Sequence, residues 1–172
     1  MHNKYIIGDG SSALIKAKPL LLDTNFVIDT IIFNKESVDL IEQLRTLKCD
    51  LITTRAVLVE TLGGTKDFDY INAKIKHLEL LFQKPFEQIV KLPIEREMPD
   101  SDDVLKFSRQ CNKFDTTDFE LYLTLKKYQH TGIMLITRNH TDFTSALFDR
   151  NGYITLFSNK EIKTYGLYSV KT

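Results

Sequence analysis

The chain has 172 residues and a formal net charge of zero, because 23 Lys and Arg balance 23 Asp and Glu. Hydrophobic residues make up 42% and Gly and Pro are scarce, which excludes disordered and collagen-like classes. No apolar run approaches the ~20 residues of a membrane helix, the amino terminus lacks the pattern of a signal peptide, and the two isolated cysteines suit a reducing cytosol. We therefore expect a cytoplasmic protein with one globular domain.

Residues 1 to 17 show little periodicity and predict an irregular extension, with 5–7 as an edge strand, before a single domain of residues 18 to 172. The short apolar run Leu20-Leu21-Leu22 does not alternate, which predicts a buried strand. Later elements follow from apolar runs and from helical spacing. In chain order we expect helices at 26–33 and 37–47, a strand at 49–53, helices at 55–62 and 67–83, a strand at 88–92, helices beginning at 102 and 115, a strand at 133–137, a helix at 142–148 and a strand at 153–157. Thr54 is expected to cap the helix at 55–62, and in the helix at 67–83, Lys74 and Lys76 are expected to face outward.

Strands that alternate with helices favour a parallel sheet that is covered on both faces. The fold class predicted from the sequence is therefore α/β, as a three-layer α/β/α sandwich with a central, mainly parallel sheet. In such a sheet, residues that follow the strands lie along one edge, where ligands bind.

Four acids have comparable settings. Asp23 ends the first buried strand, Glu60 lies in an apolar helix run, Asp118 lies near the start of a helix, and Asp142 follows the last strong strand. Each acid also has a plain explanation. Asp23 and Asp142 have the setting of helix N-caps, Asp118 could complete a capping box opened by Asp115, and Glu60 could be a solvated helix residue.

Together, the four acids suggest a shared site. At about 4 Å and an effective dielectric of about 20, each close pair of carboxylates would repel by about 4 kcal/mol. A carboxylate near the core, as expected for Glu60, also costs several kcal/mol unless it is paired or bound to a cation. Mg²⁺ or Mn²⁺ would relieve both costs, since these ions prefer oxygen ligands. Such ions activate water and stabilise the charge of a phosphoryl transition state, so the acids predict phosphodiester hydrolysis.

Several segments together resemble the PIN domain family over roughly residues 20 to 157. The matching residues are Leu-Leu-Asp-Thr-Asn at 21–25, Glu60, the helix segment 118–125, and Leu-Ile-Thr-Arg-Asn-His-Thr-Asp-Phe at 135–143. The most specific match is the strand-terminal Thr-Arg-Asn followed by Asp-Phe. The resemblance implies an endoribonuclease that depends on Mg²⁺ or Mn²⁺.

The resemblance also implies roles for particular residues. The metal-site and catalytic acids would be Asp23, Glu60, Asp118 and Asp142. Asn25 and Thr137 would help to place water, metal or phosphate, and Arg138 and Asn139 would belong to the substrate-binding set, with Arg138 touching the RNA backbone. Asp115 competes with Asp118 for the third acid. Asp118 is preferred because Leu121 and Leu125 follow it as apolar positions do in the family.

Partners follow from the same resemblance. Many bacterial PIN proteins of this size are VapC-type toxins that a small antitoxin protein inhibits, so an antitoxin joins RNA among the expected partners. Homodimers are common in the family, and no membrane partner is expected. The alternative function is a non-catalytic PIN module that binds RNA or a protein. A phosphatase with Asp23 as its nucleophile would want a second Asp two residues later, where this chain has Asn25.

Overall fold

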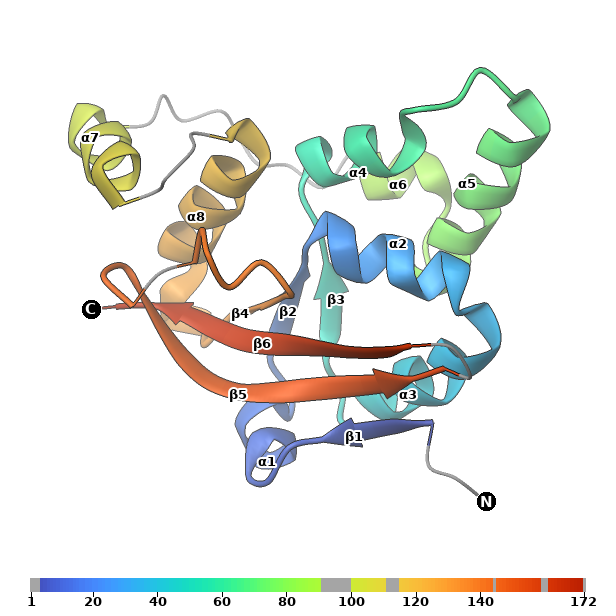
Figure 1. The fold of residues 1–172 in the computed structure, drawn as a ribbon, viewed down its shortest axis with the longest axis horizontal. Helices are drawn as coiled ribbons and strands as arrows, with labels where there is room; N and C mark the ends of the chain where they lie inside the picture. The colour runs from blue at the N-terminus through green and yellow to red at the C-terminus, as the bar shows by residue number, and fades with distance from the viewer. Residues whose placement is uncertain (1–3, 91–99, 111–114, 144, 159–160, 172) are drawn as a thin grey trace.

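The computed structural model describes residues 4–90, 100–110, 115–143, 145–158 and 161–171 (Figure 1). The strands are β1 (Tyr5–Ile7), β2 (Pro19–Leu22), β3 (Asp50–Ile52), β4 (Met134–Thr137), β5 (Phe148–Phe157) and β6 (Ile162–Val170). The helices are α1 (Ser11–Ile15), α2 (Thr24–Ile32), α3 (Asn34–Thr46), α4 (Arg55–Leu62), α5 (Phe68–Phe82), α6 (Phe86–Val90), α7 (Ser101–Gln110), α8 (Thr116–Tyr128) and the 3₁₀ turn η1 (Gln129–Thr131).

In the described part of the chain, the strands form one sheet in the order β1-β5-β6-β4-β2-β3. Strand β2 pairs in parallel with β3 and β4, whereas the pairs β4–β6, β5–β6 and β1–β5 are antiparallel. In Figure 1 the long strands β5 and β6 run across the direction of β2 and β3, so the sheet is strongly curled. The predicted three-layer sandwich with a central, mainly parallel sheet is therefore wrong.

The error arises after β4. A parallel strand next to β4 would need a crossover connection, usually a helix. The helix expected at 142–148 does not form among the described residues, which are turns up to the start of β5. The chain continues instead into the β5–β6 hairpin, and β6 returns antiparallel to β4.

A second error concerns the strand expected at 88–92. Residues 86–90 belong to helix α6, and 91–92 lie outside the described residues. The backbone N–H groups of Gln88 and Ile89 bond to the carbonyl of Pro85, so the chain takes up a helical turn directly after this proline.

The buried strands expected at 20–22 and 133–137 are confirmed. Leu20, Leu21 and Leu22 in β2 are fully buried, and all four residues of β4 are buried. Because both faces of these strands are covered, their sequences are continuous apolar runs that do not alternate with polar residues. Within the described ranges, no helix has the length and apolar character needed to cross a membrane.

Helix α4 is fixed at both ends. The hydroxyl of Thr54 accepts the backbone N–H of Val57 at 3.3 Å, which confirms the cap expected there. At the other end, the ammonium of Lys74 donates to the carbonyls of Thr61 at 2.6 Å and Gly63 at 3.5 Å. Lys74 is buried, so its predicted outward position is wrong.

Replacing Lys74 by Met is expected to lower the free energy of unfolding by about 1–3 kcal/mol, because the carbonyls at the end of α4 lose a charged donor. Urea unfolding would measure this change. The control is Lys76→Met on the exposed side of the same helix, for which a change within about 0.5 kcal/mol is expected. Equal effects of the two substitutions would contradict a stabilising role for Lys74.

Candidate active site

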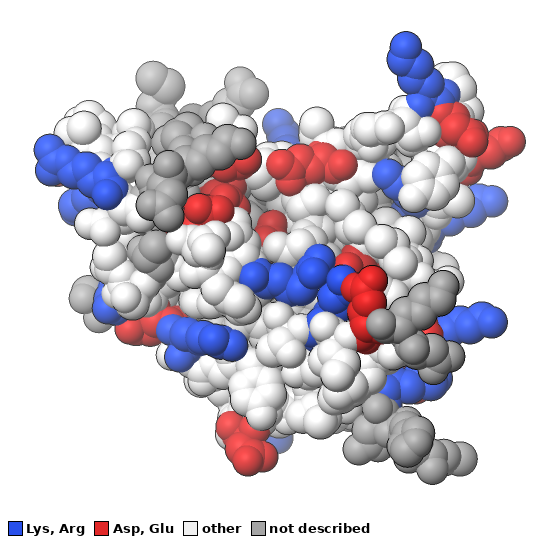
Figure 2. All heavy atoms as spheres, viewed as in Figure 1, with Lys and Arg blue, Asp and Glu red and all other residues white. Residues whose placement is uncertain are grey.

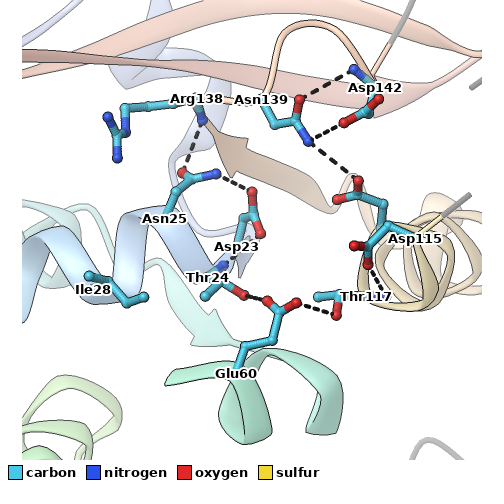
Figure 3. A pocket seen from close by; sticks show the side chains of 11 residues that line it. Asp23, Thr24, Asn25, Ile28, Glu60, Asp115, Thr117, Arg138, Asn139 and Asp142 are labelled. Carbon is cyan, nitrogen blue, oxygen red and sulfur yellow. Dashed lines mark hydrogen bonds between the residues drawn. The ribbon is translucent and has the colours of Figure 1, made fainter. Parts of the chain in front are cut away.

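An open pocket of about 380 Å³ lies where β2 and β4 end, between the first turns of α2 and α8 and the helix α4 (Figure 3). Acidic side chains gather in a hollow on this face of the molecule, and basic side chains lie beside them (Figure 2). The pocket is lined by Asp23, Thr24, Asn25, Ile28, Glu60, Asp115, Thr117, Asp118, Arg138, Asn139 and Asp142. The structure thus brings the four predicted acids to one place, and Arg138 is the single Lys or Arg among these lining residues.

Asp23 links the end of β2 to the start of α2. Its carboxylate accepts the backbone N–H of Thr24 at 2.6 Å, the hydroxyl of Thr137 at 2.5 Å and the side-chain amide of Asn25. The helix-cap explanation is therefore correct for Asp23, but the carboxylate also faces the pocket. Burial raises its pKa to about 6, and the charge of Glu60 adds to this rise, while the three hydrogen bonds oppose it.

Asn25 and Thr137 join the first turn of α2 to the end of β4. The Asn25 amide donates to the Thr137 hydroxyl at 3.1 Å, and its carbonyl accepts the backbone N–H of Arg138 at 3.0 Å. The Thr137 hydroxyl also accepts the backbone N–H of Asn139 at 2.9 Å. These bonds fix the loop that follows β4 against the helix that follows β2.

Asn139 connects two of the acids. Its side-chain amide donates to Asp142 at 2.7 Å and to Asp118 at 3.3 Å. Asp118 is buried, and burial raises its pKa to about 7, with further contributions from the charges of Asp23, Asp115, Asp142 and Glu60. Four neighbouring carboxylates therefore add to the effect of burial at Asp118.

Asp115 also lines the pocket and caps α8, since its carboxylate accepts the backbone N–H of Thr117 at 2.7 Å. Of the capping box considered for this helix start, Asp115 thus acts as the cap, while the Asp118 side chain contacts Asn139. Because Asp118 is the more buried acid and contacts Asn139, the structure favours Asp118 over Asp115 as the inner carboxylate.

Glu60 lies in the pocket for a different reason than the sequence suggested. It is exposed, and the neighbouring Val59 is 72% exposed, so α4 has an open face and the expected cost of a carboxylate near the core does not arise. The Glu60 carboxylate accepts the hydroxyl of Thr24 and, at 2.9 Å, that of Thr117 (Figure 3). It therefore bridges the starts of α2 and α8.

Sequence reasoning missed Thr24 and Thr117, which hold Glu60, and Ile28, which lines the pocket. The two threonines had a usable signal, since Thr24 directly follows the predicted acid Asp23 and Thr117 directly precedes the predicted acid Asp118. Ile28 had none, because an apolar residue in an apolar helix is normally part of the core.

The pocket offers only oxygen ligands for a cation, a donor set that suits Mg²⁺ or Mn²⁺. Among the residues that the structure describes, no three acidic, histidine or cysteine side chains are close enough to hold one metal ion. Mg²⁺ commonly uses one or two carboxylates and retains several waters. The donor set therefore fits such an ion in kind, and one or two of the carboxylates would hold it.

Comparison with protein-family models, curated proteins and solved structures finds no match for this chain.

Proposed function

We propose that this pocket is the active site of a metal-dependent endoribonuclease that hydrolyses RNA phosphodiesters. The observation that carries the proposal is the convergence of Asp23, Glu60, Asp118 and Asp142 around one open pocket. Burial and mutual repulsion raise the pKa values of Asp23 and Asp118, so a bound cation would remove a large electrostatic cost. The choice of RNA rests on the resemblance to the PIN domain.

The four acids differ in how deeply they are buried, which suggests two different roles. Asp23 and Asp118 are the buried carboxylates and would hold Mg²⁺ or Mn²⁺ directly. Glu60, fixed by two hydroxyls, and Asp142, fixed by Asn139, would orient water around it. When bound, the ion supplies an activated water and positive charge for the phosphoryl oxygens. Arg138 offers the second positive charge at the rim of the pocket.

The direct test is cleavage of a mixed pool of single-stranded and structured RNA by the purified protein. We expect cutting with Mg²⁺ or Mn²⁺ and none with EDTA, because the acids repel phosphate when no cation is bound. Adding Mn²⁺ back to the protein after the EDTA has been removed should restore the cleavage activity. Cutting that persists in EDTA would contradict a metal-dependent site and indicate a contaminating ribonuclease or another mechanism.

A second candidate is a module that binds RNA without cutting it. The observation in its favour is that no three acidic, histidine or cysteine side chains among the described residues approach closely enough to hold one ion. This candidate predicts equal RNA affinity in Mn²⁺ and in EDTA, with the RNA recovered intact. The same RNA pool therefore separates the two functions.

A further inference from the structure

Arg138 is anchored by a buried acid outside the group of metal-site carboxylates. Asp29, in the second turn of α2, is 3% exposed, and one of its oxygens lies 2.9 Å from Nε of Arg138, an ion pair by distance but without hydrogen-bond geometry. The same oxygen accepts the hydroxyl of Tyr165 at 2.7 Å. Tyr165, on β6, is fully buried, so the acid is held between a neutral donor and a cation.

Tyr165 supports Arg138 in two ways. Burial and the bond to Asp29 raise the pKa of its hydroxyl, which therefore remains a neutral donor. Its ring also lies beneath the arginine, with 6.0 Å between the guanidinium carbon and the ring centroid. Because the backbone N–H of Arg138 is held by Asn25, the residue is fixed at both its backbone and its head group.

The position of Arg138 matters because it borders an acidic pocket. An arginine free to turn would be drawn to Asp23 or Asp118, and would then occupy the carboxylates that a metal ion needs. In Figure 3 its side chain instead extends along α2, away from Asp142. The contact with Asp29 is made through Nε and leaves the two terminal amino groups of the guanidinium unused. In arginine these groups can make bidentate contacts with a phosphate.

We propose that Asp29 and Tyr165 are positioning residues that keep Arg138 off the metal-site acids and present it to a phosphate next to the cleaved bond. This role rests on the proposed nuclease function. In this role Asp29 does more than stabilise the fold through an ion pair, because it keeps the Arg138 guanidinium away from the metal-site acids.

The test is a cycle of Asp29→Asn, Arg138→Ala and the double variant, measured as kcat/KM on RNA. Asp29→Asn keeps the size of the side chain and an acceptor for Tyr165, and it makes the protein more positive. General electrostatics would therefore raise the affinity for RNA, whereas loss of positioning lowers kcat/KM, on the order of tenfold. In the Arg138→Ala background, the same change should have less than about a twofold effect, because Asp29 acts through Arg138.

Metal affinity provides a readout that does not depend on turnover. By calorimetry, Asp29→Asn should weaken Mn²⁺ binding on the order of several-fold, because a released Arg138 competes for the carboxylates, and Arg138→Ala should restore it. Tyr165→Phe changes no charge and should show the same effects in weaker form. Asp39→Asn is the matched control. Asp39, on α3, forms an exposed pair with Lys4, and its substitution should change neither quantity.

An equal loss from Asp29→Asn with and without Arg138 would overturn the proposal, as would unchanged Mn²⁺ affinity in both Asp29→Asn and Tyr165→Phe. A wild-type protein that binds Mn²⁺ but cuts no RNA would instead remove the nuclease function. In that case the calorimetric cycle still decides whether Asp29 keeps Arg138 away from the acids.

Discussion

Replacing Asp23 by Asn should lower the rate of RNA cleavage by at least about 10³-fold, the scale seen when a central electrostatic group is removed from an active site. Asp23 is the most buried of the five acids that line the pocket and accepts hydrogen bonds from Thr24, Asn25 and Thr137. Asn keeps the size of the side chain but cannot supply the negative charge that the cation requires. Initial rates with saturating Mg²⁺ would measure the loss.

The variant must be shown to fold, since Asp23 also caps α2. Circular dichroism and the midpoint of thermal unfolding provide that check, and Asp39→Asn on the surface of α3 is the matched charge control. A folded Asp23→Asn protein that retains more than about a tenth of the wild-type rate would contradict the assignment of Asp23 to the reaction.

Without divalent cations, the free energy of unfolding should fall by about 1–4 kcal/mol as the pH rises from about 5 to about 8. The folded-state pKa values of Asp23 and Asp118 are raised from 3.8 to about 6 and about 7. In this range the folded state therefore binds more protons than the unfolded state, so a rise in pH favours unfolding. Divalent cations should reverse the loss, because they bind the ionised carboxylates of the folded state.

Urea unfolding in EDTA at the two pH values would measure this slope, with Asp118→Asn as the comparison. The substitution removes the group with the higher pKa, so it should stabilise the protein at the higher pH and have little effect at the lower one. His77 and His140, whose pKa values are lowered by burial, act in the opposite direction, and the comparison cancels their share. A wild-type slope that Asp118→Asn leaves unchanged would show that Asp118 is not its source.

Local chemistry made much of the secondary structure predictable. The uninterrupted apolar runs in β2 and β4 reflect burial on both faces, and the caps at Thr54 and Asp115 satisfy backbone N–H groups at helix starts. Asp23 and Asp118 could be found because each follows a strand or opens a helix at the same end of the sheet.

The pairing of the strands could not be predicted in the same way. Whether β6 joins β4 in a parallel or antiparallel sense depends on a contact between distant segments, and no local pattern records it. The β6 segment also contains Gly166 and alternates unevenly, which hid the strand. For Glu60, the missing information was which face of α4 the rest of the protein leaves uncovered.

The hydrogen bond between Thr137 and Asp23 joins residues that are 114 positions apart. A nascent chain that has emerged only as far as α8 already carries Asp23, Glu60 and Asp118. It still lacks β4, whose last residue is Thr137, and the loop after β4 that contains Asp142. The carboxylates therefore acquire their arrangement only after β4 has been synthesised, because this contact requires the closure of a very long loop. We therefore expect a truncated chain that ends before β4 to show no RNA cleavage at this site.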